Sequence, residues 1–309
     1  MIVTEGLTRK FGERLAVDQL NLEVREGEVF GFLGPNGAGK TTTVRMLAAL
    51  IAPTSGRASV AGFRLGEENH KIREAVGVLT ESPGLYEKLS AYQNLEFFAQ
   101  LYGLRDRAAQ VEKYLRMLEL WERRDEPVGR FSKGMRQKVA LARALIHEPK
   151  VLFLDEPTAG LDPEAAKLVR DFIEGLAKEH RRTIFLCTHN LSEAERLCDR
   201  IGLIKQRLVK VGTPEELKGE LYGRRTVIQL KSLPPSAEGA IREFPFVENL
   251  QADGHKLIMT LSDPEAQNPL IVRRLVELGG EVQWVQEMRH TLEEVYLDLI
   301  SEEGGATAR

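Results

Sequence analysis

The 309-residue sequence has few cysteines, no long apolar run and no excess of positive charge. Its two cysteines, Cys187 and Cys198, are too few for a disulfide framework and lack the spacing of metal ligands. They suit a reducing compartment. A formal net charge of −3 argues against a general binder of polyanions, although it leaves room for a local basic patch.

Hydrophobic segments of membrane-spanning length are also missing from the sequence. No apolar run approaches the roughly 18 residues that a transmembrane helix needs. The first residues, Met1 to Glu5, lack the basic and apolar regions of a secretory signal peptide. The sequence therefore predicts a cytoplasmic protein that would serve a membrane only through a partner.

A glycine-rich turn between two apolar segments is the most informative stretch of the chain. It follows a strand-like run at 29–33 and precedes helical spacing at 43–50, and it fits the phosphate-binding pattern GxxxxGK[ST]. Glycines allow backbone N–H groups to point at phosphate oxygens beside a positive helix end. The residues predicted to bind a nucleoside triphosphate are Gly34, Pro35, Asn36, Gly37, Ala38, Gly39, Lys40, Thr41 and Thr42. Lys40 is expected to reach the terminal phosphates and Thr41 to bind Mg²⁺.

Two adjacent acids end a second buried strand, at 151–154. Parallel neighbouring strands would bring this end beside Lys40, where Asp155 can hold Mg²⁺ directly or through water. Glu156 can accept a proton from an attacking water. Two acids that merely cap a strand are the structural alternative, which a neighbouring phosphate loop disfavours.

Three other residues are ambiguous on their chemistry alone. Phe11 lies on a turn between two N-terminal strands, where it could stack on a nucleobase, but such an aromatic more often serves ordinary packing. Ser132 precedes the helix 133–146 and forms either an anion site or a plain helix cap. His189 follows the strand 183–187, and a lone histidine there is more often structural than functional.

Strands and helices alternate in the first two thirds of the chain, which predicts an α/β core with a parallel sheet. Antiparallel strands precede this core over 2–33. Apolar residues at three- and four-residue steps over 86–147, without a strand signal, predict an inserted helical subdomain.

The chain starts again near residue 220, which predicts two domains, 1–219 and 220–309. The second has the order βαββαβ, as in a split-βαβ, ferredoxin-like α+β domain, with one helix expected at 269–278. A capping box at 291–294 is expected to open a closing helix over 291–300. No catalytic pattern occurs in this part, so we expect it to regulate the protein or to help pair its subunits.

Five motifs in this order resemble those of the ATP-binding subunit of ABC transporters. They are the phosphate loop, Phe131-Ser132-Lys133-Gly134-Met135, Leu154-Asp155-Glu156-Pro157-Thr158, Gly160-Leu161-Asp162 and Thr188-His189. The resemblance covers roughly residues 2–215. It implies a phosphate-loop NTPase fold, ATP and Mg²⁺ as cofactors, and ATP hydrolysis.

The resemblance also implies roles for individual residues and a second copy of the chain as partner. Phe11 would stack on adenine, Glu156 would be the catalytic base, and His189 would contact the γ-phosphate. Two copies would pair head to tail, so that the signature residues of one face the ATP of the other. On this view, the residues that act across the interface are Ser132, Lys133, Gly134 and Met135, with Asp162 in the loop beside it.

Two departures from the family pattern point to a subgroup. Phe131, Lys133 and Met135 replace residues of the usual Leu-Ser-Gly-Gly-Gln signature, while the serine and second glycine remain. Glu81 stands where most relatives have a glutamine that senses Mg²⁺ and the permease, and its carboxylate can still ligate the metal. Both variants resemble exporter ATPases that work with a separate transmembrane permease chain at the inner face of the cell membrane.

Two alternatives belong to other functional classes. A soluble ABC-type ATPase that acts on nucleic acid or ribosomes typically has long coiled-coil arms or two nucleotide domains, and the sequence shows neither. No direct contact with nucleic acid is therefore expected. A phosphate-loop kinase or GTPase is disfavoured by the signature stretch, and the Asn-Lys-x-Asp motif of GTPases is absent from the sequence.

Overall fold

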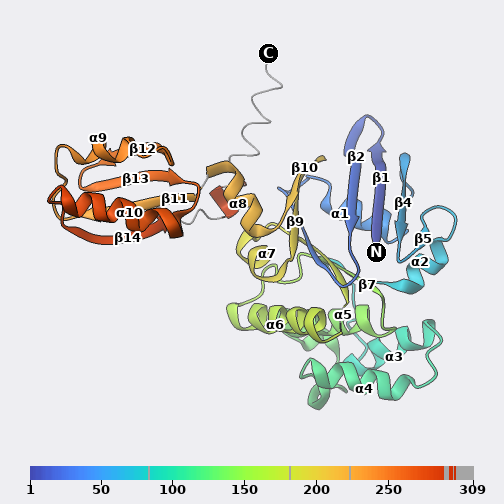
Figure 1. Ribbon diagram of the computed structural model, residues 1–309. Helices are drawn as coiled ribbons and strands as arrows, with labels where there is room; N and C mark the ends of the chain where they lie inside the picture. Colours follow the sequence, from blue (N-terminus) through green and yellow to red (C-terminus); the bar gives the residue numbers. More distant parts are fainter. Residues whose placement is uncertain (83, 181, 223, 289–291, 295, 297–309) are drawn as a thin grey trace. The chain divides into compact units, whose positions relative to one another are not determined.

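A computed structural model describes the chain except for residues 83, 181, 223, 289–291, 295 and 297–309 (Figure 1). The chain divides into two compact units, Met1–Thr213 and Pro214–Arg309, which are described separately. Among the described residues, no helix is long and apolar enough to cross a membrane.

A six-stranded sheet forms the centre of the first unit. In spatial order its strands are β10 (Arg207–Gly212), β9 (Arg200–Lys205), β3 (Val29–Leu33), β8 (Thr183–Thr188), β7 (Val151–Asp155) and β6 (Val76–Leu79). All neighbouring pairs are parallel except β9 and β10. Strands β3, β7 and β8 are buried along their whole length, which explains their continuous apolar sequences.

A second, antiparallel sheet completes the β-structure of this unit. Its strands are β2 (Arg14–Val24), β1 (Ile2–Phe11), β4 (Ser55–Val60) and β5 (Phe63–Arg64), in that spatial order. Residues from both sheets share one hydrophobic core, in which Ile2, Leu20 and Val60 lie with Phe30 and Phe153. This shared core joins the N-terminal strands to the central sheet.

Four helices directly precede or follow strands of the central sheet along the chain. They are α1 (Lys40–Leu47), α2 (Asn69–Ala75), α6 (Pro163–His180) and α7 (Leu191–Leu197). The inserted subdomain contains α3 (Ala91–Leu101), α4 (Arg107–Met117) and α5 (Lys133–Leu145), with short 3-10 turns at Trp121–Arg123 and Val128–Arg130. Helix α3 starts with a capping box, in which Ser90 accepts the N–H of Gln93 and the Gln93 side chain accepts the N–H of Ser90.

The second unit combines a four-stranded antiparallel sheet with helices. Its elements are α8 (Pro214–Tyr222), β11 (Arg224–Leu230), α9 (Ala237–Arg242), β12 (Val247–Asp253), β13 (Lys256–Leu261), α10 (Pro264–Glu277) and β14 (Val282–Met288). The strand order β12-β13-β11-β14 places one strand between the two strands of each βαβ unit. The expected split-βαβ arrangement is therefore confirmed.

The fold class predicted from the sequence is confirmed, but two details of the second unit differ. Helix α10 begins at Pro264 rather than at Pro269, because Asp263 accepts the N–H of Ala266 as N-cap. Pro269 therefore lies inside the helix. The sequence does not predict helix α8, which runs across residue 219, the predicted domain boundary. The closing helix expected at 291–300 lies largely outside the described residues. Thr291, the first residue of the expected capping box, is also outside them.

Candidate nucleotide-binding site

The carboxyl ends of three parallel strands meet at one edge of the central sheet. Leu33 of β3 is paired with Thr188 of β8, and Asp155 of β7 is paired with Cys187. The segments that follow these strands are therefore neighbours in space, although they are far apart in the sequence. Such an edge is the usual ligand site of an open α/β sheet.

The turn after β3 curls in the way that its glycines allow. Gly37 and Gly39 have φ of 83° and 103°, where side chains are disfavoured. A Cβ at Gly39 would lie 2.4 Å from the carbonyl oxygen of Ala16, so the close approach also requires glycine. The loop leads into α1 and presents a concave backbone to solvent, as expected for a phosphate cradle.

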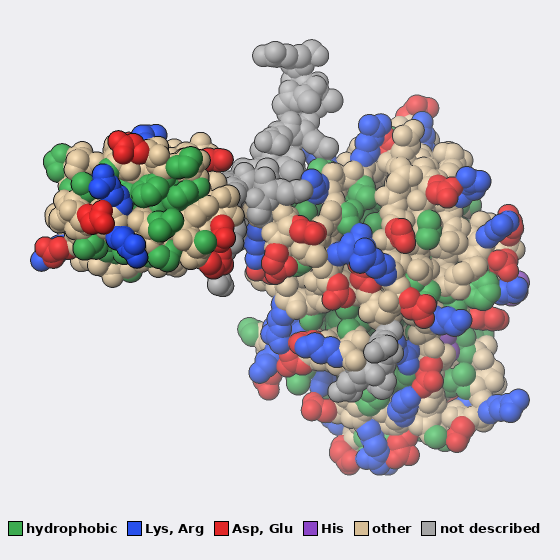
Figure 2. All heavy atoms as spheres, viewed as in Figure 1, with side chains coloured by type: hydrophobic (Ala, Val, Ile, Leu, Met, Phe, Trp, Pro, Cys, Tyr) green, Lys and Arg blue, Asp and Glu red, His purple; other side chains and the backbone are tan. Residues whose placement is uncertain are grey.

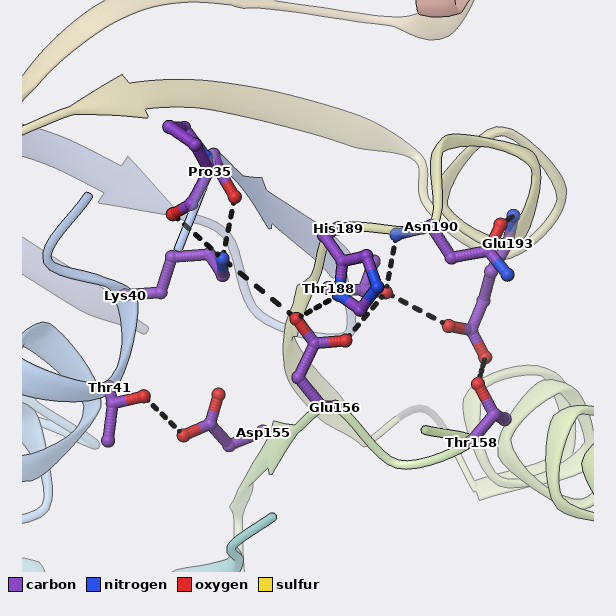
Figure 3. Close-up of polar contacts among 11 residues, drawn as sticks. Pro35, Lys40, Thr41, Asp155, Glu156, Thr158, Thr188, His189, Asn190 and Glu193 are labelled. Atoms are coloured by element: carbon purple, nitrogen blue, oxygen red, sulfur yellow. Dashed lines mark hydrogen bonds and ion pairs between the residues drawn. The ribbon is translucent and has the colours of Figure 1, made fainter. Parts of the chain in front are cut away.

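Lys40 lies at the base of this cradle. Its Nζ donates to the carbonyl oxygens of Gly34 at 2.6 Å and Pro35 at 3.3 Å (Figure 3). The same Nζ is 3.9 Å from Oε1 of Glu156. The ammonium is thus held at the loop by neutral acceptors and by one carboxylate, and it is a fixed positive charge that anionic oxygens can approach.

Thr41 and Asp155 form the second half of the site. The Thr41 hydroxyl donates to Oδ2 of Asp155 at 2.7 Å. Burial raises the pKa of Asp155, and the hydrogen bond from Thr41 opposes this shift. With Glu81 on the wall of the same cavity, the available donors are hydroxyl and carboxylate oxygens, which are the ligands that Mg²⁺ prefers. The residues present therefore fit a magnesium ion.

Glu156 has an unusual backbone conformation. Its φ is 53°, in the left-handed region, and its N–H donates to the carbonyl oxygen of Cys187 at 2.8 Å. A non-glycine residue held there costs about 1–3 kcal/mol, and such strain clusters at functional sites. The side chain, 12% exposed, has Oε1 at 2.8 Å from Nδ1 of His189 and Oε2 at 3.3 Å from the Thr188 hydroxyl.

These groups surround one cavity of about 420 Å³. Its described lining residues are Phe11, Arg14, Ala16, Pro35, Asn36, Gly37, Gly39, Lys40, Thr41, Thr42, Glu81, Asp155, Glu156, Ala159 and His189. Gly34 and Ala38 belong to the same loop but are not among the described lining residues, and a Cβ at Gly34 would lie 2.3 Å from the carbonyl oxygen of Ile204. Arg14, Ala16 and Ala159 are lining residues that sequence reasoning missed, and only the closeness of Arg14 to Phe11 could have suggested one of them.

Phe11 ends β1 at the mouth of the cavity. Its side chain is 48% exposed, and the guanidinium of Arg9 lies 4.5 Å from the ring centroid. The ring therefore has a cation over it and still offers surface to the cavity. A planar base can stack on such a ring.

The signature residues lie elsewhere on the first unit. Ser132 caps α5 by accepting the N–H of Met135 at 3.2 Å, and Ser132 and Lys133 are exposed. A Cβ on Gly134 would lie 2.8 Å from Cβ of Ala165, near the start of α6. Asp162 accepts the N–H of Ala165 at 2.9 Å. The described residues that line the cavity do not include Ser132, Lys133, Gly134, Met135 or Asp162.

Comparison with known protein families and structures gives two domain matches. Residues 17–159 match the ABC transporter family, and residues 212–300 match the C-terminal domain of DrrA1-3-like ATP-binding proteins. The second match covers most of the α+β unit, so both units have counterparts in one kind of protein.

Two relatives agree with these matches. The daunorubicin resistance ATP-binding protein DrrA3 of Streptomyces coeruleorubidus is 37% identical over 306 residues, which is 98% of this chain and 96% of the relative. The bacitracin transport ATP-binding protein BcrA of Bacillus licheniformis is 44% identical over 67% of each chain.

Two solved structures have the same fold as the first unit. A dimeric post-hydrolysis state of the ATP-binding cassette MJ0796, bound to ADP and Pi, has a TM-score of 0.63 at 26% identity and covers 69% of this chain and 98% of that one. The cbiO1 protein from Clostridium perfringens, part of an ABC transporter complex, has a TM-score of 0.65 at 30% identity over 71% of this chain and 90% of that one. The chain therefore belongs to the ABC transporter family, as an ATP-binding subunit with ATPase activity.

Proposed function

We propose that two copies of this chain pair head to tail and power a membrane exporter through a separate permease. One observation supports the pairing most directly: the described lining of the nucleotide cavity lacks the signature residues, of which Ser132 and Lys133 are exposed on the same unit. Ser132 and Lys133 at the N-terminal end of α5 are suited to anionic oxygens, because a helix N-terminus is positive and Lys133 adds a charge. A second copy would supply these groups to the open side of the cavity.

Within each site, the chain's own residues have distinct roles. Backbone N–H groups of the phosphate loop and Nζ of Lys40 hold the phosphates of ATP. Phe11 stacks on the base. Glu156 accepts a proton from the attacking water, and His189, beside Glu156, contacts the terminal phosphate.

Magnesium is the second proposed cofactor. Thr41, Asp155 and Glu81 would hold it, directly or through water, beside the phosphates. When bound, the ion neutralises charge on the phosphate oxygens. The hydrogen bond between Thr41 and Asp155 at 2.7 Å keeps both oxygens at one place before the metal arrives.

A groove between the core and the helical subdomain is suited to a permease helix. Its apolar lining includes Leu50, Val78, Phe98 and Tyr102, and Leu50 and Tyr102 are exposed side chains. Apolar side chains exposed in a groove are typical of a surface that receives another protein. This contact would place the chain at the cytoplasmic face of the membrane.

The charge distribution and the relatives both favour export over the nucleic-acid alternative. Figure 2 shows acidic and basic side chains interspersed on the visible face of the first unit, whereas a nucleic-acid binder presents a basic stripe. Among the relatives, BcrA is named for bacitracin transport and DrrA3 for daunorubicin resistance.

Pairing can be tested by mixing two inactive variants. Lys40→Ala removes the cation of the phosphate loop, and Ser132→Arg blocks the signature. A head-to-tail dimer of one copy of each contains one intact site, so mixing should restore part of the ATPase activity. If each site were built from one chain alone, mixing would restore none, and the pairing proposal would be wrong.

Export can be tested with inverted membrane vesicles. Cells that make this chain together with a candidate polytopic permease should yield vesicles in which the chain copurifies with that protein. Addition of ATP should drive uptake of a cargo candidate, and vesicles with the Lys40→Ala chain are the control. Copurification with ribosomes or nucleic acid instead would support the alternative.

A further inference from the structure

A buried carboxylate, that of Glu193, is linked to Glu156 through the hydroxyl of Thr188. Glu193 is in the first turn of α7, is 2% exposed and does not line the cavity. Its Oε1 accepts the hydroxyl of Thr158 at 2.9 Å, and its Oε2 accepts that of Thr188 at 3.2 Å (Figure 3). Its side chain therefore ties together the segment after β7 and the end of β8.

The Thr188 hydroxyl lies between two carboxylates. Its Oγ1 is 3.2 Å from Oε2 of Glu193 and 3.3 Å from Oε2 of Glu156, and it accepts the N–H of Asn190 at 3.0 Å. A hydroxyl has one hydrogen, so it can donate fully to only one of the two carboxylates at a time. Glu193 and Glu156 therefore compete for a single donor.

Burial of the Glu193 carboxylate costs free energy unless its oxygens accept hydrogen bonds. Burial raises the pKa of Glu193, and the charge of Glu156 adds to the shift. The hydrogen bonds from Thr158 and Thr188 and the charge of Arg170 oppose it. A buried acid with two hydroxyl donors from different segments is a satisfied polar network, in which removal of one member affects the others.

We propose that Glu193 is a positioning residue for the carboxylate of Glu156. This inference rests on the proposed role of Glu156 as the base. Glu193 holds the hydrogen of Thr188 and leaves Oε2 of Glu156 free to accept the proton of water. Its bond to Thr158 also fixes the segment that carries Glu156. When Glu193 cannot accept, the Thr188 hydrogen turns to Glu156, and a carboxylate that already accepts a hydrogen bond takes up a proton less readily.

The central test is Glu193→Gln in the full chain. The amide keeps the volume, accepts from Thr158 and donates to Oγ1 of Thr188, so the hydrogen of Thr188 is directed to Glu156. We expect kcat for ATP hydrolysis to fall about tenfold or more, as part of the ~10²–10⁴ that a positioned base contributes. KM for ATP should stay within about twofold, because no atom of Glu193 lines the cavity. The matched control is Glu195→Gln, the same change at an exposed position of α7.

A double-mutant cycle with Thr188 separates positioning from a purely structural role. In Thr188→Val the shared hydrogen is gone, so adding Glu193→Gln should lower kcat little further. Thr188→Ser keeps a hydroxyl and should retain most of the activity. A structural role alone would lower the melting temperature but leave kcat of the folded protein unchanged in Glu193→Gln.

Two results would overturn the inference. One is a kcat for Glu193→Gln equal to that of Glu195→Gln. The other is an equal fall in kcat with and without the Thr188 hydroxyl. If instead Glu156→Gln hydrolyses ATP at the parent rate, Glu156 is not the base. This result can be told apart from a failure of the Glu193 inference, because it is obtained with Glu193 unchanged.

Discussion

Nδ1 of His189 lies 2.8 Å from Oε1 of Glu156, and the two residues, which directly follow the adjacent strands β8 and β7, line the same cavity. An ionised carboxylate only accepts hydrogen bonds, so Nδ1 carries the hydrogen and Nε2 is left for another partner. The histidine is 62% exposed, whereas Glu156 is 12% exposed. The carboxylate is thus held from one side by a residue that remains accessible to a ligand.

Glu156→Gln should keep ATP binding and nearly abolish turnover. The amide has the shape of the carboxylate, and its oxygen can accept from His189 in the same way, but it cannot accept a proton from water. Loss of a general base typically costs ~10²–10⁴ in kcat. The variant should therefore accumulate as an ATP-bound dimer, which size-exclusion chromatography with and without ATP would detect. Hydrolysis close to the parent rate would contradict the assignment.

Glu81→Gln should raise the Mg²⁺ concentration needed for half-maximal ATPase activity. A neutral amide replaces a carboxylate on the cavity wall, so the divalent ion loses a charged ligand, and we expect a shift of about threefold or more. Binding of ATP without metal should not weaken, because a negative charge near the phosphates is removed. Glu87→Gln, at an exposed position outside the cavity lining, is the control. An unchanged Mg²⁺ dependence would remove Glu81 from the metal site.

His147 should make the stability of the first unit sensitive to mild acid. Its ring stacks on Tyr102 with 3.9 Å between centroids, and its Nε2 lies 3.0 Å from the carbonyl oxygen of Val76. Burial lowers the pKa of His147 from its ordinary value of 6.5. The unfolded chain therefore takes up this proton at a higher pH than the folded chain. The neutral histidine stabilises the fold above about pH 6.5, and this contribution is lost as the pH falls below it.

Urea unfolding of the parent and of His147→Phe tests this dependence. Between about pH 7.5 and 5.5, the stability advantage of the parent should shrink by at most about 1.4 kcal/mol for each pH unit below 6.5. His70→Gln, at an exposed position, should show no such narrowing. A constant difference between parent and variant would mean that His147 has the same affinity for protons in both states.

A chain that ends at Thr213 should bind ATP with the affinity of the full chain. The described residues that line the nucleotide cavity all lie in the first unit. The second unit exposes Leu270, Val276 and Trp284, and hydrophobic side chains are visible on its face in Figure 2. We expect its removal to weaken pairing or coupling to the permease, measured by ATP-dependent dimerisation. A truncated chain that folds but does not bind ATP would contradict this division of labour.

Most of the fold could be predicted because local pattern and tertiary structure agree. The uniformly buried strands β3, β7 and β8 have continuous apolar sequences, and the helical subdomain has clear helical spacing. The apolar spacing predicts α10 only from Pro269, whereas the Asp263 cap and Pro264 start the helix earlier. The sequence does not predict helix α8, because its apolar residues do not recur with a clear helical period.

The site could be predicted only where a motif carries it. The phosphate loop, Asp155, Glu156 and His189 belong to recognisable patterns, and the structure brings them to one cavity. Glu193 could not be found in this way, because an acid in the first turn of a helix is ordinary and its partners are 35 and 5 residues away in the chain. Such contacts become visible only in the three-dimensional structure, where the ends of β7 and β8 lie beside α7.

The close approach of Gly134 to Ala165 also has an evolutionary consequence. A Cβ at position 134 would lie 2.8 Å from the Ala165 methyl group. A side chain at position 134 therefore requires a smaller residue at position 165. Gly134→Ala alone should therefore displace the start of α6, while Gly134→Ala with Ala165→Gly should be tolerated. Relatives that lack a glycine at the first position are expected to carry one at the second, and the two sites should covary across the family.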